Sequence, residues 1–385
     1  MERRDFIRVT GGGVVLAATG GLASCSSRMP AEAIEAWSGP APQEDVRRWI
    51  LSYAILAPHS HNLQSWLVDL ATPDEIWLRC DLNRLLPETD PYSRQIMMSH
   101  GTFLELLDIA ARERGLRATV ELFPEGAFAA EKVDQRPVAR IRLAPDVAVQ
   151  KDPLFAQILR RHTNRGLYDF QRPLPLDAWQ AMNDAAKPSL RFGYVGADNP
   201  DRLEQHRAIA AEAWRVELTT ARTILESFKV LRVGATEVAK HRDGLVVMDP
   251  MVVLLDRVGL FDRSHAPAPD SYATTSQIKD FNRKLESTPG FLWMVTDGNE
   301  RTTQVNAGRA YARVQLAATA HGVSMQPLQQ ALQEYPEQAQ TRADIRRLVQ
   351  ALQPTQKVQM WARVGYAPPV EPAPRRPLNA IVVRG

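Results

Sequence analysis

The chain has 385 residues, a formal net charge of +3 at pH 7, 44% apolar residues and 24% charged residues. Its lysines and arginines form no long block, so neither the balance nor the pattern of charge favours a nucleic-acid partner. Ordinary apolar content over this length can build one large domain or two smaller ones.

The first 24 residues have the layout of an export signal. The charged start MERRDFIR is followed by a weakly apolar stretch rich in Gly and Ala, which is too short to cross a bilayer as a stable helix. The order R-R-x-F-I-R resembles a twin-arginine signal, and residues 22–25 (LASC) resemble a bacterial lipobox. We therefore expect a signal over residues 1–24, lipidation of Cys25, and a periplasm-facing protein anchored to the envelope membrane.

The sequence indicates neither a nucleotide-binding loop near the N-terminus nor a disulfide. Three consecutive glycines at 11–13 have no preceding strand and no acidic residue at the right distance, so a nucleotide-binding loop is not indicated. The only cysteines are Cys25 and Cys80. Lipidation of Cys25 leaves Cys80 without a partner, so a core rather than a disulfide must stabilise the exported chain.

A tether is predicted over residues 25–44, followed by a first half over residues 45–150. Apolar periodicity in this half predicts, in order, a helix, two short strands, a long helix and two further strands, over residues 44–56, 66–70, 75–81, 96–115, 118–124 and 138–145.

The second half, residues 151–385, begins with two predicted helices (152–161 and 176–187) and a strand (190–196). A helix-rich stretch over residues 201–258 follows, then a strand, a long helix, a helix and a strand over residues 290–297, 300–323, 341–352 and 357–367. Residues 213–275 read as a helical insertion, which either covers a binding site as a lid or completes the core.

The two long helices resemble each other. Each has an early small residue, an apolar middle, an Ala-Ala pair and a terminal Gly, followed by a short extended segment. This similarity indicates a divergent duplication, although amphipathic helices in general resemble one another.

Several short motifs resemble those of the nitroreductase family of flavoproteins. The family pattern A-P-S-x-x-N-x-Q-P-W corresponds to Ala57, Pro58, Asn62, Gln64 and Trp66. Its R-x-S-x-R, A-A-x-x-x-G, G-Y and R-R-P motifs correspond to Arg161-Thr163-Arg165, Ala317-Ala318-Gly322, Gly365-Tyr366 and Arg375-Arg376-Pro377. The resemblance covers residues 45–385 and implies an α+β, nitroreductase-like fold with mixed or antiparallel sheets flanked by helices.

The chain departs from the family pattern in residues and in order. His59, Ser65 and Thr163 replace the usual serine, proline and serine, and Thr163 keeps the hydroxyl. The R-x-S-x-R segment normally precedes the A-P-S-x-x-N loop, whereas here it follows it. Because the family forms homodimers with flavin at the interface, this order resembles the fused, single-chain (Acg-like) branch: a monomer acting as a fused dimer, with one FMN per chain.

The resemblance assigns the cofactor contacts. Arg161, Arg165 and an Arg375 or Arg376 fork would bind the FMN phosphate by charge-assisted hydrogen bonds, and Thr163 would add a neutral one. Pro58, His59, Ser60, Asn62 and Gln64 would line the ribityl chain and the pyrimidine edge. Met325 and Gln326 lie in the segment that the family places near flavin N5.

Other interpretations of the same residues remain open. His59 and His61 are two residues apart and could ligate a metal, although no third ligand is recognisable. Arginines 161 and 165 could be a solvated helix end, and Arg375 and Arg376 a basic tail. Trp66 and Trp293 read as core residues, and His162 as exposed.

The resemblance implies a ping-pong oxidoreductase that passes hydride or electrons through flavin N5 to a small acceptor, such as a nitroaromatic or quinone. The cofactor carries the chemistry, so no protein residue is nominated as catalytic. NAD(P)H is not expected outside the cytoplasm, so a membrane quinol or a redox protein is the expected donor. The alternatives are a lipoprotein that binds or shields flavin with little turnover, and an envelope lipoprotein that is not an enzyme.

Overall fold

The computed structural model describes residues 28–42, 44–186, 188 and 190–384. The predicted signal and Cys25 lie outside the described residues. The segment predicted as a tether carries helix α2 (Ala31–Ile34) and the 3-10 helix η1 (Glu35–Ser38). None of the helices within the described ranges is both long and apolar enough to cross a membrane.

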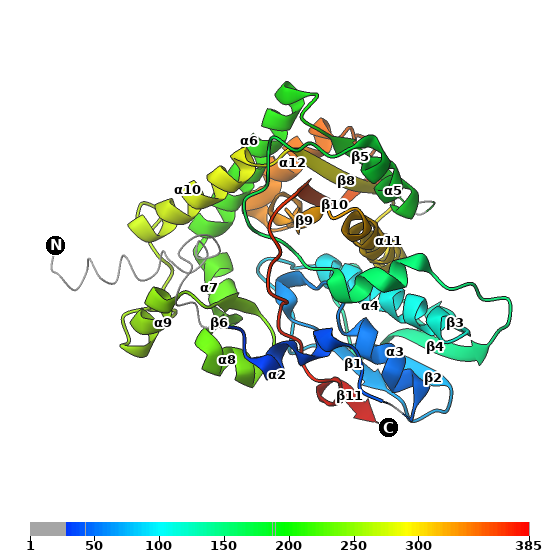
Figure 1. Cartoon of the computed structure of the whole chain (residues 1–385). Helices are drawn as coiled ribbons and strands as arrows, with labels where there is room; N and C mark the ends of the chain where they lie inside the picture. Colours follow the sequence, from blue (N-terminus) through cyan, green and yellow to red (C-terminus); the bar gives the residue numbers. More distant parts are fainter. Residues whose placement is uncertain (1–27, 43, 187, 189, 385) are drawn as a thin grey trace.

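The first half is a sheet with a long helix beside it (Figure 1). The sheet has the order β11-β1-β2-β4-β3, and its central pairs are antiparallel. Trp66 at the start of β1 is fully buried, as predicted. The elements are α3 (Val46–Ala54), β1 (Trp66–Asp69), β2 (Glu75–Cys80), α4 (Arg94–Glu113), β3 (Leu116–Leu122) and β4 (Pro137–Pro145).

The last strand of this sheet comes from the other end of the chain. β11 (Val382–Arg384) follows the short helix η6 (Leu378–Ala380) and pairs in parallel with β1. No strand is predicted there from the sequence, because a three-residue strand has no periodicity to read. The C-terminal segment therefore runs back across the first half.

The second half repeats the combination of a sheet and a long helix. Its antiparallel sheet has the order β5-β8-β10-β9, and Trp293 in β8 is buried, as predicted. The first predicted helix is instead a 3-10 helix, η3 (Pro153–Arg160). The other elements are α5 (Leu176–Ala186), β5 (Arg191–Val195), β8 (Gly290–Asp297), α11 (Arg301–Ala320), β9 (Ser324–Pro327), η4 (Gln330–Leu332), η5 (Pro336–Gln338), α12 (Ala339–Leu348) and β10 (Gln356–Gly365).

The predicted insertion region has a small core of its own. Buried apolar side chains, among them Phe228, Val247 and Phe261, form a separate cluster there. A parallel pair of three-residue strands, which the sequence did not predict, lies beside this cluster. The elements wholly inside residues 213–275 are α7 (Ala221–Lys229), β6 (Leu231–Val233), α8 (Gly234–His241), β7 (Leu245–Val247) and α9 (Pro250–Arg257). The longer helices α6 (Pro200–Thr219) and α10 (Tyr272–Glu286) cross its two boundaries.

Helices α4 and α11 pack against each other at the centre of the molecule (Figure 1). The contact is close at two glycines: a Cβ on Gly101 would lie 1.9 Å from Val305 O, and one on Gly308 would lie 1.8 Å from Met98 O. Only glycine permits this approach. The early small residues of both helices therefore join the halves, and the predicted α+β class is confirmed.

Candidate functional site

The loop between α3 and β1 adopts a strained conformation. His61, Asn62 and Gln64 have φ values of 48°, 53° and 54°. Residues other than glycine rarely adopt this region, and they persist there only when surrounding contacts fix them. Such strain is concentrated at binding sites, which makes this loop a candidate wall of one.

Helix α4 fixes the start of the loop. Thr102 Oγ1 donates to Pro58 O at 2.7 Å, and Ser60 N donates to Ser99 Oγ at 3.2 Å. The backbone of Pro58 and Ser60 is therefore positioned by the same helix that joins the two halves.

Both ring nitrogens of His59 are engaged with backbone groups. Nε2 accepts from Ser65 N at 3.1 Å, so Nδ1 carries the proton and donates to Ser60 O at 2.8 Å. Burial lowers the pKa of His59 to about 3, so the ring is neutral at pH 7. With both nitrogens occupied, His59 has no free lone pair for the metal that its spacing from His61 allowed.

Asn62 holds the C-terminal segment against the loop. Its Oδ1 accepts from Arg375 Nη1 at 2.8 Å, and its Nδ2 donates to Pro374 O at 3.1 Å. The side chain predicted to meet the flavin edge thus also orients an arginine predicted to bind phosphate.

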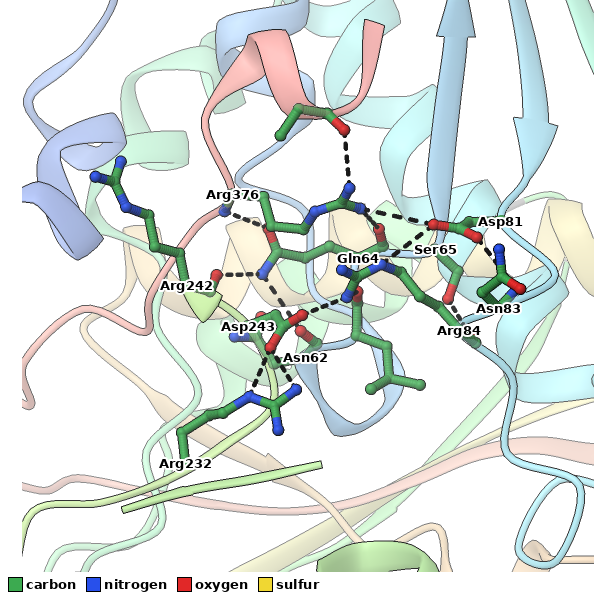
Figure 2. A network of polar contacts seen from close by, with 12 residues as sticks. Asn62, Gln64, Ser65, Asp81, Asn83, Arg84, Arg232, Arg242, Asp243 and Arg376 are labelled. Carbon is green, nitrogen blue, oxygen red and sulfur yellow. Dashed lines mark hydrogen bonds and ion pairs between the residues drawn. The ribbon is translucent and has the colours of Figure 1, made fainter. Parts of the chain in front are cut away.

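Gln64 is only 1% exposed, and like Asn62 it bonds to the C-terminal segment. Its Oε1 accepts from Arg376 N at 2.8 Å, and its Nε2 donates to Arg242 O at 3.0 Å (Figure 2). Gln64 therefore joins the loop to the C-terminal segment and to the insertion region.

Two buried arginines, one from each side of this junction, meet at one carbonyl. Arg161 Nη2 donates to Leu56 O at 2.8 Å, and Arg375 Nη2 donates to the same oxygen at 3.1 Å. Arg161 Nη1 also donates to Gln315 Oε1 at 3.1 Å. Arg161 and Arg375 are 2% and 4% exposed, and neither forms an ion pair with any carboxylate of the described chain.

This arginine pair carries charge that the described residues do not balance. Burial lowers the pKa of Arg161 to about 10, and burial followed by the charge of Arg161 lowers the pKa of Arg375 well below its usual value. Nε of each is buried and has no hydrogen-bond partner among the residues that the structure describes. Buried charge is costly unless it is paired, which makes the arginine pair a candidate anion site.

Arg376 does not belong to this pair. Its Nη1 donates to Gln64 O at 3.1 Å and its Nη2 to Ala380 O at 2.8 Å, and it lies 4.0 Å from Asp81. Of the two arginines in the predicted fork, Arg375 is a member of the pair and Arg376 is not.

The motif of Arg161 brings β9 alongside. Thr163 forms an isolated parallel bridge with Met325, and Asn164 N donates to Met325 O at 3.1 Å. Half-buried Thr163 therefore lies beside the segment of Met325 and Gln326. The Gln326 side chain is engaged, since its Oε1 accepts from Arg363 Nε at 2.7 Å.

Arg165 is the unpaired cation of the motif. Across the described ranges, no hydrogen bond or ion pair engages its guanidinium, and its side chain is exposed. Burial, then the charge of Arg165, lowers the pKa of His61 to about 4, which places the two side chains near each other. The loop of the first half and the arginine motif of the second half thus meet at one place, as predicted.

The structure adds three side chains that sequence reasoning missed. Tyr311 and Gln315 on α11 lie beside the arginines, and the buried Tyr311 hydroxyl has no hydrogen-bond partner within the described part of the chain. Trp37 packs over both guanidiniums. His162, predicted as exposed, is half-buried with its ring centroid 4.6 Å from that of Trp37. Trp37, Tyr311 and Gln315 stand in no motif that the sequence analysis recognised, so no local pattern marks them.

The insertion region docks onto the strained loop through a single turn (Figure 2). Gly244 N donates to Asn62 O at 3.1 Å, and buried Asp243 pairs with Arg232 at 2.8 Å and with Arg84. Gly244 has φ of +76°, and a Cβ there would lie 2.1 Å from Val230 O. The position requires glycine on both counts.

Two relatives from Mycobacterium tuberculosis, strains H37Rv and CDC 1551, bear names that assign them provisionally as NAD(P)H nitroreductases. Each is 29% identical over 354 residues, which is 89% of this chain and 92% of the relative. No family model matches the chain.

Solved structures give weaker matches. The FMN-dependent nitroreductase NfnB of Mycobacterium smegmatis, in complex with NADPH, is 18% identical over 58% of this chain and 94% of that one, with a TM-score of 0.36. A protein of Anabaena variabilis, provisionally named a nitroreductase, is 10% identical over 90% of this chain and 93% of that one, with a TM-score of 0.42. The two sequence relatives support a nitroreductase-family protein.

Proposed function

We propose that the protein is an FMN-dependent oxidoreductase that binds one flavin between the two halves of a single chain. The observation that carries this proposal is the set of three guanidiniums, Arg161, Arg165 and Arg375, without a carboxylate partner among the described residues. A duplicated, fused ancestor accounts for the loop being present only in the first half and the arginine motif only in the second.

The residues present fit FMN. Its phosphate carries up to two negative charges and accepts several hydrogen bonds, which suits the unpaired Nε atoms of Arg161 and Arg375 and the free guanidinium of Arg165. Burial, and then the repulsion by Arg161, lowers the pKa of Arg375, and a bound anion would offset both effects. The Thr163 hydroxyl can add a neutral hydrogen bond to the same group.

When bound, FMN supplies hydride or electron transfer through its N5 to a small acceptor, such as a nitroaromatic or a quinone. The protein's part is to bind and orient the ring. Pro58, Ser60 and Asn62 would form one wall, and the backbone at Met325 and Gln326 the other. His59 and His61 are neutral at pH 7, so they can contact the ring without adding charge.

The proposal also names an electron donor, because the predicted export signal would place the protein outside the cytoplasm. A protein exported by the twin-arginine route and lipidated at Cys25 meets no cytoplasmic NAD(P)H, so a membrane quinol or a redox protein would reduce it. Rapid bleaching of the bound flavin by NADPH would contradict this donor, whereas reduction by a quinol analogue and not by NADPH would support it.

The second candidate function is flavin binding with little turnover. Docking of the insertion region onto the loop at Gly244 and Arg242 favours it, because this contact covers part of one wall. Multiple turnovers with any donor and acceptor pair would exclude the second candidate, and stable yellow protein without turnover would favour it.

The visible spectrum of protein purified without added flavin tests the proposal itself. Wild type is expected to show flavin absorbance, and Arg161→Gln with Arg165→Gln together should abolish it. Arg160→Gln is the matched control, because Arg160 is the exposed neighbour of Arg161 and its guanidinium donates to Gln157. Colourless wild type that does not bind added FMN would overturn the proposal.

A further inference from the structure

The N-terminal segment around residues 30–38 is fastened to the C-terminal segment that carries Arg375. Trp37 is 8% exposed, and its indole Nε1 donates to Ala373 O at 2.8 Å. On the other side, Arg375 N donates to Ala33 O at 2.8 Å. These two bonds place an indole directly against the arginine pair, in a region that composition alone marks as a tether.

The indole faces both guanidiniums. The Arg375 guanidinium carbon lies 4.9 Å from the centroid of the ring, and that of Arg161 lies 5.5 Å from it. An aromatic face stabilises a cation through its quadrupole, most strongly when the contact is removed from water. Trp37 therefore supports two like charges that have no carboxylate partner within the described residues.

A carboxylate at this position would act differently. It would neutralise the arginines and compete with any incoming anion for their N–H groups. An indole stabilises the charges without accepting their strong hydrogen bonds, so the buried Nε atoms stay available. An aromatic partner thus stabilises Arg161 and Arg375 and leaves their N–H groups able to bind an anion.

We propose that Trp37, and with it the N-terminal segment, is part of the phosphate-binding site: it holds Arg161 and Arg375 together and keeps water from them. Trp37 is thus a positioning residue that acts through the arginines, and it selects flavin bearing a phosphate over flavin without one. This inference rests on the proposed FMN function.

The test compares FMN with riboflavin, which has the same ring and ribityl chain but no phosphate. Flavin-free protein is titrated with each, and binding is followed by quenching of flavin fluorescence. Trp37→Ala is expected to weaken FMN binding about five- to thirtyfold, which corresponds to the about 1–2 kcal/mol that a dehydrated cation–π contact is worth. Riboflavin affinity should not change.

Two further variants separate the ring face from simple packing. Trp37→Phe keeps an aromatic face and should retain most of the FMN preference, whereas Trp37→Leu keeps apolar bulk and should lose it. These two also serve if Trp37→Ala does not fold. Trp77→Ala is the matched control: Trp77 lies 5.1 Å from the Arg140 guanidinium and its indole donates to Glu75, away from the arginine pair.

Each outcome decides the inference. Equal loss of FMN and riboflavin binding would show a merely structural role, and unchanged or tighter FMN binding would show that the indole does not support the phosphate site. Either result overturns the inference while leaving the proposed function intact. Failure of wild type to bind FMN would instead overturn the proposed function.

Discussion

The strained loop of the first half and the arginine motif of the second half differ in how far their polar groups are paired within the protein. The loop's polar groups are satisfied within the protein: Asn62 and Gln64 bond to the C-terminal segment and His59 to its own backbone. In the motif, Arg165 is unpaired among the described residues and Arg161 retains a buried N–H without a partner. The loop is therefore held in place by contacts within the protein, whereas the arginine motif keeps positive charge and N–H groups that a ligand could pair.

The largest effect should come from separating the two regions. Gly308→Val would place side-chain atoms on the Met98 carbonyl, where even a Cβ lies at 1.8 Å. We expect a loss of about 3 kcal/mol or more in the free energy of unfolding, measured by urea denaturation, and loss of bound flavin.

The control for this variant is Gly115→Asn. Gly115 has φ of +68°, a Cβ added there would meet no described atom within 4 Å, and Asn tolerates that conformation. It should stay close to wild type. Normal stability of Gly308→Val would mean that the halves do not depend on the α4–α11 contact.

On the charged side, Arg375→Gln should lower FMN affinity by roughly ten- to hundredfold, since hydrogen bonds to charged groups are worth about 1.5–3 kcal/mol. Riboflavin binding should fall much less. Arg376→Gln is the comparison, because its guanidinium bonds to Gln64 and Ala380 instead. If the two variants lose FMN equally, the distinction between the two arginines is wrong.

The strained loop should respond differently. Gln64→Ala leaves Arg376 N and Arg242 O without their buried partner, so the free energy of unfolding should fall by about 1–3 kcal/mol. Affinity for FMN and for riboflavin should fall together, because the loop carries no phosphate contact of its own. Selective loss of FMN binding, measured by fluorescence titration, would place Gln64 on the charged side.

The smallest effect concerns acid sensitivity. Burial holds the pKa of His59 near 3, below its ordinary value of 6.5. Between these two pH values the unfolded chain binds a proton at His59 that the folded chain does not bind. Stability is therefore full above pH 6.5 and falls as the pH drops toward 3. Between pH 7 and pH 6 the free energy of unfolding, measured with urea, should therefore fall less in His59→Gln than in wild type. The difference between the two should be less than about 1 kcal/mol.

The variant and wild type share the other titrating groups, so the difference between their pH profiles reports His59. Identical profiles would mean that His59 takes up its proton over the same pH range in the folded and the unfolded chain.

Sequence motifs predicted which segments meet, but less of what their side chains do. Thr163 pairs with Met325, and Arg165 lies near His61, as the motif order implied. Arg161 bonds to Leu56 O, just before the loop. The engagement of Asn62 by Arg375 and the strand β11 depend on contacts more than 300 residues apart in the chain, which no local pattern encodes.

Trp37 illustrates the remaining difficulty. Its neighbours are small residues and prolines, which composition marks as a flexible linker. Only the folded C-terminal segment gives the indole its bond to Ala373 and the two guanidiniums their aromatic partner. A tether and a wall of a binding site can thus share one composition, and long-range contacts decide between them.

The most direct test of a single site built from both halves is the number of flavins per chain. Protein purified as a monomer should release one FMN per polypeptide on denaturation, measured by absorbance against protein concentration, and should rebind one. Two FMN per chain would contradict the fused-site account. Monomeric protein that neither carries nor rebinds FMN would contradict the claim that the unpaired arginines await its phosphate.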